Sequence, residues 1–271
     1  MRSNGPPDTH NRHRTAFNEQ VKDVIRTADI VLLVLDARSP EQTRNKELEQ
    51  EIREQNKYLV HILNKADLID IKQFPPEVLT SLSYPVFVSY KTNIGLGKLR
   101  SRIKILAQKS RKSRGYEHVH VGIIGYPNTG KSSITNFLTH RKLAAASQQT
   151  GLTRGTQFAR LGKNLMLIDS PGVLGTTEAN PYSHSNTAKL AVTAAASVDK
   201  IKDPGIVVHN LVQAHQAAFE KYYSIQMGND SEILITTLGA RWKMLKKKGL
   251  VDEDKVARKV ISEWQAGKIV S

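Results

Sequence analysis

The sequence predicts an α/β fold: a mostly parallel β-sheet with helices on both faces, followed by a smaller α-helical domain. Apolar runs of strand length alternate with helical segments over the first part of the chain, which is the pattern of strands joined by helical crossovers. Past about residue 180 the apolar residues recur at helical spacing only. We therefore expect one domain at residues 1–180 and a second at residues 181–271.

The first domain opens with apolar residues at helical spacing between Phe17 and Ala28. Continuous apolar runs then predict strands buried on both faces, at residues 30–35, 58–63, 85–89 and 119–124. Helices are expected at residues 41–55, after Pro75-Pro76, at residues 96–106 and from Lys131 onward. Residues 156–161 and 165–169 predict a hairpin that turns at Gly162-Lys163-Asn164.

Three helices are expected in the second domain, from the apolar residues between Val208 and Tyr223, Leu234 and Leu245, and Val256 and Trp264. Trp242 and Trp264 are expected as core anchors of this domain. His209 and His215 are six residues apart, which does not place them on one helix face. We therefore expect no metal site there.

The composition excludes several classes of protein. The chain contains no Cys, which excludes disulfides, thiolate zinc sites and cysteine nucleophiles. No run approaches 18 apolar residues, so no membrane-spanning helix is expected. The first 14 residues are basic without an apolar segment, which does not fit a secretory signal. The expected location is cytoplasmic, with an organelle-targeting peptide left open because the segment is rich in Arg.

Positive charge predicts a polyanionic partner. The chain has 40 Lys and Arg against 25 Asp and Glu, for a net charge of +15. Two runs contain basic residues and no acid. The first holds Lys98, Arg100, Arg102, Lys104, Lys109, Arg111, Lys112 and Arg114, and the second holds Arg241, Lys243, Lys246, Lys247 and Lys248. Such runs favour contact with nucleic-acid phosphates.

A phosphate-binding loop is predicted where the fourth strand meets a helix. Residues 125–132 match the pattern G-x-x-x-x-G-K-[ST]. Gly125 and Gly130 let backbone N–H groups close around phosphates, and the helix N-terminus adds its positive end. Lys131 is expected to neutralise the β- and γ-phosphates, and the hydroxyl of Ser132 to bind Mg²⁺.

A second motif, D-x-x-G, follows the hairpin. Asp169 stands at a strand end, where its carboxylate can hold Mg²⁺ through water. Gly172 has no side chain, so its N–H can reach a γ-phosphate.

A base-reading motif ends the second predicted strand at residues 64–67, Asn-Lys-Ala-Asp. The Asp67 carboxylate can accept two hydrogen bonds from guanine, and a site of this kind rejects a base without those donors by roughly 10⁴–10⁵-fold. The aliphatic stem of Lys65 can lie over the base plane. Ser89 and Lys91 follow the third strand and are expected to close the base pocket.

The order of these motifs carries a family resemblance. The base-reading motifs precede the phosphate loop, whereas in ordinary GTPases they follow it. In this respect the chain resembles the circularly permuted GTPases of the YlqF/YawG type. The opening Asp36-Ala37-Arg38-Ser39-Pro40 and the ending at residues 264–268 are also similar to that family. In the permuted chain, residues 107–118 are expected to form the join.

The resemblance implies further roles. Thr153 matches the family's first switch segment and is expected to bind Mg²⁺ and sense the γ-phosphate, with Thr156 as the alternative. Val173 stands where Ras-like proteins carry a water-orienting Gln, which implies slow intrinsic hydrolysis. Asn128 matches a loop Asn that in some related GTPases helps to hold K⁺, which implies a potassium requirement.

Three sets of site residues result. The predicted nucleotide-binding residues are Asn64, Lys65, Asp67, Ser89, Lys91, Gly125, Asn128, Thr129, Gly130, Lys131, Ser132, Ser133 and Gly172. The predicted catalytic residues are Lys131, Thr153 and Gly172. The predicted metal ligands are Ser132, Thr153 and Asp169.

The resemblance and the charge imply a GTP-hydrolysing switch that contacts ribosomal RNA during assembly of the large subunit. One alternative is an RNA-binding scaffold that uses GTP only as a structural ligand. Another is an ATP-dependent enzyme such as a kinase, which Asn64 and Asp67 oppose.

Overall fold

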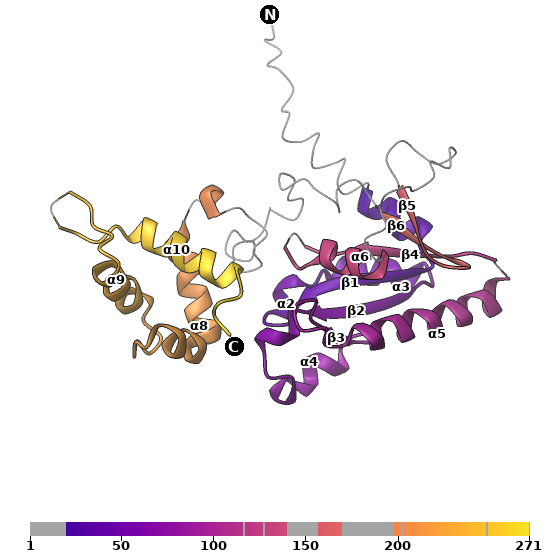
Figure 1. Cartoon of the computed structure of the whole chain (residues 1–271), viewed down its shortest axis with the longest axis horizontal. Helices are drawn as coiled ribbons and strands as arrows, with labels where there is room; N and C mark the ends of the chain where they lie inside the picture. Colours follow the sequence, from indigo (N-terminus) through magenta and orange to yellow (C-terminus); the bar gives the residue numbers. More distant parts are fainter. Residues whose placement is uncertain are drawn as a thin grey trace, which may run out of the picture.

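The computed structural model describes residues 20–115, 117–126, 128–139, 157–169, 198–201, 203–247 and 249–270. Its main feature is a six-stranded sheet with the strand order β3-β2-β1-β4-β6-β5 (Figure 1). The strands are β1 (Ile30–Asp36), β2 (Tyr58–Asn64), β3 (Val86–Val88), β4 (Val119–Ile124), β5 (Gln157–Gly162) and β6 (Leu165–Asp169). All neighbouring pairs are parallel except the β5–β6 hairpin, which is antiparallel. The predicted mostly parallel sheet and the predicted hairpin are therefore confirmed.

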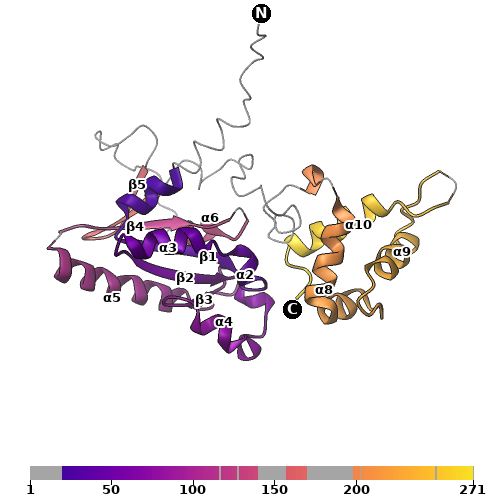
Figure 2. The same cartoon turned by 180° about the vertical axis from the view of Figure 1, so that it is seen from behind.

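Helices cover both faces of this sheet (Figures 1 and 2). Residues of α5 (Leu96–Arg114) and α6 (Lys131–Thr139) pack on one face with Ile30, Leu32 and Val34 of β1. A helix at residues 20–27 and α3 (Lys46–Glu54) pack on the other face, with Val31, Leu33 and Leu35. Every residue of β1 is buried, because its alternate side chains enter two different cores.

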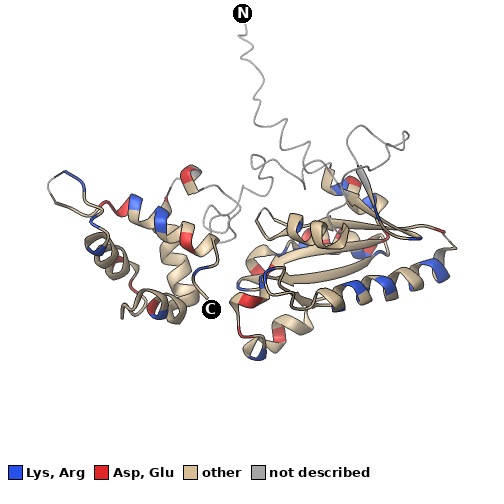
Figure 3. Cartoon of the chain, viewed as in Figure 1, with Lys and Arg blue, Asp and Glu red and all other residues tan. Residues whose placement is uncertain are grey.

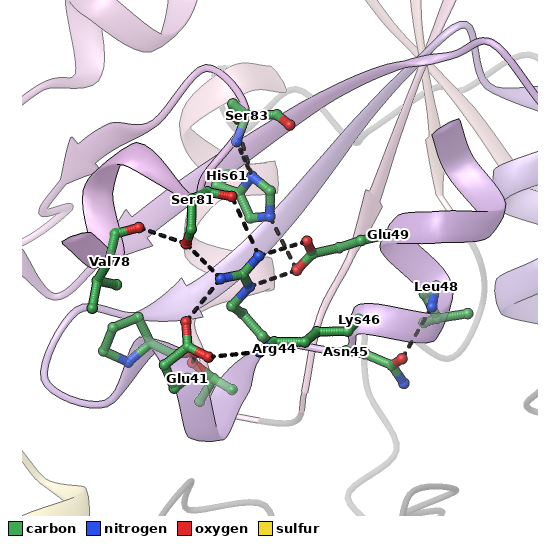
Figure 4. A network of polar contacts seen from close by, with 12 residues as sticks. Glu41, Arg44, Asn45, Lys46, Leu48, Glu49, His61, Val78, Ser81 and Ser83 are labelled. Carbon is green, nitrogen blue, oxygen red and sulfur yellow. Dashed lines mark hydrogen bonds and ion pairs between the residues drawn. The ribbon is translucent and has the colours of Figure 1, made fainter. Parts of the chain in front are cut away.

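The helix predicted over residues 41–55 is wrong in one respect, because two helices occupy this stretch. α2 (Pro40–Thr43) ends before Arg44, whose backbone is extended, and Asn45 begins α3 by accepting a hydrogen bond from the Leu48 N–H. Arg44 leaves the helical path to bind the buried carboxylate of Glu49 through its Nε and Nη2, at 2.8 and 2.9 Å (Figure 4). A buried ion pair and an N-cap thus outweigh local helix propensity.

The basic helix is longer than predicted. α5 continues to Arg114 and ends at Gly115, whose φ of 69° is left-handed. It therefore includes most of the predicted join at residues 107–118. Ala107, the first residue past the predicted stretch, is buried in the sheet's core, so packing extends the helix beyond the stretch that the apolar pattern indicated.

Three helices form a second core. They are α8 (Pro204–Tyr223), α9 (Ser231–Arg241) and α10 (Glu253–Gln265), and a short turn, η3 (Val198–Lys200), precedes them. Trp264 is 1% exposed at the centre of this core and Trp242 packs against it, as predicted. The predicted domain boundary near residue 180 lies outside the described residues. Within the described part of the chain, no helix combines the length and the apolar character needed to cross a membrane.

The helix predicted as far as Leu245 ends earlier. α9 stops at Arg241, and Lys243 has a left-handed φ of 54°. Leu245 instead forms an antiparallel bridge with Val251. Most of the second basic run therefore lies in the loop between α9 and α10. The remaining short helices are η1 (Ala66–Leu68), η2 (Ile71–Gln73) and α4 (Pro76–Thr80).

Candidate nucleotide-binding site

The predicted motifs lie at the carboxyl edge of the parallel sheet. Asp36 ends β1 in register with Asn64, which ends β2, and Asn64 is in register with Val88 at the end of β3. β4 ends at Ile124, in register with Leu33 of β1. Loops that leave this edge form the usual ligand-binding crevice of open α/β sheets. The sheet therefore brings the base-reading turn and the phosphate loop to one edge.

Two glycines of the phosphate loop are required by its geometry. Gly125 has φ of 145°, and a Cβ there would lie 2.5 Å from the carbonyl oxygen of Val34. Gly130 has φ of 99°, and a Cβ there would lie 2.0 Å from Asn64 Nδ2. Neither position accepts a side chain, because the backbone angle and the close neighbour both oppose it. The loop is thus packed directly against β1 and β2.

Lys131 begins α6, with its side chain directed at its own loop. Its Nζ donates to the carbonyl oxygen of Tyr126 at 2.5 Å, and burial lowers the pKa of Lys131 to about 8. Thr129 is fully buried and donates from its hydroxyl to the same carbonyl at 2.9 Å. A partly desolvated ammonium at a helix N-terminus is a strong site for an anion.

The other predicted loop residues differ in exposure. Ser132 and Asn128 are exposed, and Ser133 is half-buried. Asn128 has a left-handed φ of 58°, a conformation that Asn adopts more readily than most residues. An exposed hydroxyl at Ser132 beside the anion site fits a metal ligand in position and chemistry.

The base-reading turn contacts the phosphate loop. Asn64 is 4% exposed, and its Nδ2 donates to the carbonyl oxygen of Thr129 at 2.7 Å. Lys65 follows with a left-handed φ of 60°, and Asp67 lies half-buried in η1. Two predicted motifs that lie 65 residues apart are thus joined by one buried hydrogen bond.

The turn after β3 is held by its own contacts. Ser89 is 1% exposed, its N–H donates to the Ile94 carbonyl at 3.0 Å, and its hydroxyl accepts from the Thr92 N–H at 3.2 Å. Lys91 is exposed on this turn. Both residues stand at the same sheet edge as Asn64, which is where the base pocket was predicted.

The predicted magnesium residues are only partly described. Asp169 ends β6, which runs parallel to β4 with Ile168 opposite Gly122, so its backbone reaches the edge from which the phosphate loop leaves. A hydroxyl from Ser132 and a carboxylate are hard oxygen donors of the kind that Mg²⁺ prefers. Thr153, Thr156, Gly172 and Val173 lie outside the described residues.

Sequence reasoning missed a buried ion network beside the base-reading turn. Asp36 accepts two hydrogen bonds from Arg38, from Nε to Oδ1 at 3.1 Å and from Nη2 to Oδ2 at 2.8 Å. Its Oδ2 also accepts from Lys65 Nζ at 2.9 Å. Burial alone would raise the pKa of Asp36, but the two cations outweigh it and hold the pKa well below its usual range. The only signal in the sequence was the resemblance of residues 36–40 to a family motif.

Comparisons with known proteins agree with this arrangement. Residues 120–238 match the family model described as 50S ribosome-binding GTPase. The uncharacterized GTP-binding protein MJ1464 of Methanocaldococcus jannaschii is 37% identical over 255 residues, which cover 92% of this chain and 65% of that protein. Nucleolar GTP-binding protein 2 of Saccharomyces cerevisiae is 31% identical, over 93% of this chain and 52% of that protein. The chain thus spans about half to two thirds of the length of these relatives.

Solved structures share the whole fold. YlqF from T. maritima with bound GNP has a TM-score of 0.64 at 22% identity, covering 93% of this chain and 94% of that one. GDP-bound YlqF has a TM-score of 0.63 at 23% identity, covering 93% and 96%. At this identity the likeness concerns the fold alone. The chain therefore has the circularly permuted fold of YlqF, as the order of its motifs predicted.

Proposed function

We propose that this protein is a guanine-nucleotide switch that binds GTP and hydrolyses it slowly to GDP and phosphate. The observation that carries the proposal is the hydrogen bond from Asn64 to the Thr129 carbonyl. It ties a turn with the chemistry for reading guanine to a loop with the chemistry for holding phosphates. The relatives named as GTP-binding proteins support the same function.

The predicted catalytic and metal-binding residues, together with Asp67 and Asn128, have specific roles in this proposal. Asp67 accepts the two guanine donors, and Lys131 neutralises the β- and γ-phosphates. Ser132, Thr153 and Asp169 would hold Mg²⁺, which when bound supplies charge stabilisation to the phosphates. The Gly172 N–H senses the γ-phosphate. Val173 offers no group to orient water, so we expect a slow intrinsic rate that a partner raises, and Asn128 points to a test of K⁺ dependence.

We propose ribosomal RNA, in an assembling large subunit, as the partner of this switch. The matching family is described as 50S ribosome-binding, and several relatives are named nucleolar. The net charge of +15 suits a polyanion. Residues 1–180 would form the switch, and residues 181–271 would contribute to RNA contact. Cytoplasmic residence is part of the proposal.

The exposed face of α5 is a suitable surface for RNA phosphates (Figure 3). Two of its arginines are committed to packing, because the Arg100 guanidinium lies 4.3 Å from the Phe137 ring centroid and that of Arg102 lies 5.3 Å from the Tyr84 ring. The exposed cations of the helix, none of them paired with a described carboxylate, are Lys98, Lys104, Lys109, Arg111 and Lys112. A row of unpaired cations on a rigid helix gives affinity without base specificity.

Calorimetry tests nucleotide recognition. GTP is expected to bind the full chain, ATP is expected not to compete, and Lys131→Ala is expected to abolish or strongly weaken binding. Equal binding of ATP and GTP, or unchanged binding by Lys131→Ala, contradicts the proposal.

Co-sedimentation with separated ribosomal subunits tests the switch. Association with the large subunit is expected to differ between GDP and a non-hydrolysable GTP analogue, and to weaken steeply with added salt. Identical association with GDP, with GTP and without nucleotide favours instead the scaffold that uses GTP as a structural ligand. Salt-independent association counts against phosphate contacts.

A further inference from the structure

The end of the helical domain packs on the base-reading turn. Gly267 follows α10 with a left-handed φ of 70°, and a Cβ there would lie 2.9 Å from Leu68 Cδ1. Leu68 is 5% exposed and comes directly after Asp67, the residue expected to read guanine. The two positions are almost 200 residues apart in the chain. A residue without a side chain thus lets the C-terminal segment approach the nucleotide site.

A second contact reaches the same turn through charged groups. Arg38 Nη1 donates to the Trp264 carbonyl at 2.8 Å, and its guanidinium carbon lies 4.0 Å from the indole centroid. The same guanidinium holds the Asp36 carboxylate, which in turn holds Lys65 Nζ. One set of buried groups therefore runs from the Trp264 carbonyl to the lysine next to Asn64.

A third contact lies beside these two. The backbone of α8 departs from helical geometry at His215, with φ of −138° and ψ of 32°. Its ring packs 4.6 Å from the Trp264 ring, and its Nε2 lies 3.2 Å from the Ser39 hydroxyl. Burial, with the charge of Arg38 as the second cause, lowers the pKa of His215 to about 4, so the ring is neutral at pH 7. The kink thus places a neutral hydrogen-bonding group on the segment that contains Arg38.

These contacts have a common consequence for guanine binding. Arg38 is 6% exposed, and among the described residues its guanidinium donates to Asp36 and to the Trp264 carbonyl. Loss of the Trp264 contacts would leave a buried donor without its acceptor and would loosen the pair that holds Lys65. Loss of the Gly267 contact would uncover Leu68, which belongs to η1 together with Asp67.

We propose that residues 264–267 hold the turn at residues 64–67 in its guanine-binding geometry. Arg38, Trp264 and Gly267 are then positioning residues for guanine recognition. The inference rests on the proposed GTP binding. It couples recognition of the guanine base to the helical domain through contacts that do not involve the γ-phosphate. Because coupling between sites is reciprocal, guanine binding also strengthens docking of the C-terminal segment.

The test compares two glycine variants of the full chain. Gly267→Ala adds a methyl group against Leu68, whereas Gly249→Ala adds one at a similar left-handed φ of 78° with nothing within 4 Å. The two variants carry comparable backbone strain, and only the first disturbs the contact with the base-reading turn. Arg38→Lys is the second arm, since it keeps the charge and loses the fork that binds Asp36 and the Trp264 carbonyl.

Two diphosphates separate positioning of the turn from general destabilisation. Asp67 can accept two hydrogen bonds from the base of GDP but one from that of inosine diphosphate, which lacks the 2-amino group. Gly267→Ala and Arg38→Lys are expected to weaken GDP binding at least about 5-fold, which is the lower end of the usual coupling between two sites of one protein. Both variants are also expected to lower the ratio of the affinity for GDP to the affinity for inosine diphosphate. Gly249→Ala is expected to match the unmodified chain in both.

The remaining outcomes distinguish failure of this inference from failure of the proposed function. Unchanged GDP affinity in both variants overturns the inference, as does equal weakening of the two nucleotides or an equal effect of Gly249→Ala. Failure of the unmodified chain to bind GDP contradicts the proposed function instead. Hydrogen exchange gives an independent readout, because GDP is expected to slow exchange of amides at residues 264–270 in the unmodified chain and less so in Gly267→Ala.

Discussion

Replacing Glu49 with glutamine is expected to destabilise the protein strongly, although Glu49 lies outside the nucleotide site. The Glu49 side chain is fully buried and faces Arg44 and His61 (Figure 4), and Arg53 of its own helix also binds it. Arg44 binds both its oxygens, Arg53 Nη2 donates to Oε2 at 3.1 Å, and His61 Nε2 lies 3.2 Å from Oε1. The Ser83 N–H donates to His61 Nδ1, and Nε2 is the ring nitrogen on the side of the carboxylate. Glutamine would place an amide donor among these donors.

The magnitude follows from the burial of both partners. The Arg44 side chain is 5% exposed, so its charge would lose its main counterion without gaining water. Removing one partner of a buried ion pair costs about 3–5 kcal/mol. At roughly 2–4 °C per kcal/mol for a chain of this size, the expected fall in melting temperature is about 6–20 °C.

Thermal unfolding followed by circular dichroism measures the effect, with Glu54→Gln as the matched control. Glu54 lies on the same helix and is exposed, and the Gln50 amide donates to it. The same chemical change at Glu54 is expected to alter the free energy of unfolding by less than about 0.5 kcal/mol. Equal melting temperatures for the two variants would refute the argument.

The pH dependence gives a second check. Burial would raise the pKa of Glu49, but hydrogen bonds from Arg44 and His61 outweigh it and lower the pKa from 4.5 to about 2. A lowered pKa in the folded state means that the stabilisation is complete above pH 4.5 and is lost as the pH falls toward 2. The difference between the unmodified chain and Glu49→Gln is therefore expected to shrink over this range. A difference that stays constant down to pH 2 would show that ionisation of Glu49 contributes nothing.

Three further predictions concern the proposed function. Asn64→Ala removes the donor to the buried Thr129 carbonyl, and an unsatisfied buried carbonyl costs about 1–3 kcal/mol. GDP affinity is therefore expected to fall about 5- to 150-fold in a fluorescent-nucleotide titration. Unchanged affinity would contradict the proposed link between the two loops. Asp67→Asn replaces an acceptor pair with one acceptor and one donor, so a competition assay is expected to show preference moving from guanosine to xanthosine nucleotides. Lys104→Ala with Lys109→Ala is expected to weaken RNA binding and to reduce the salt slope by about one per lost phosphate contact, and an unchanged slope would place the RNA elsewhere.

Local features of the sequence account for most of the sheet and the phosphate loop. The strands are short, continuous apolar runs, because both faces of a parallel strand are buried, and β1 to β4 lie close to the predicted ranges. The phosphate loop can be recognised in the sequence because its glycines have backbone angles and close neighbours that only glycine tolerates. The order of the motifs carried most of the family resemblance that predicted the permuted fold.

Tertiary contacts decided what no local pattern contains. The break at Arg44 exists because a buried carboxylate on the next helix binds its guanidinium. The hydrogen bond between Arg38 and the Trp264 carbonyl joins positions 226 residues apart, and neither residue type indicates the other. The spacing of apolar residues shows which face of a helix or strand is buried, but it does not show which residue from a distant part of the chain packs against that face. The sequence by itself therefore predicted which residues gather at the sheet edge, and only the folded chain decided that the helical domain packs against the turn expected to read the base.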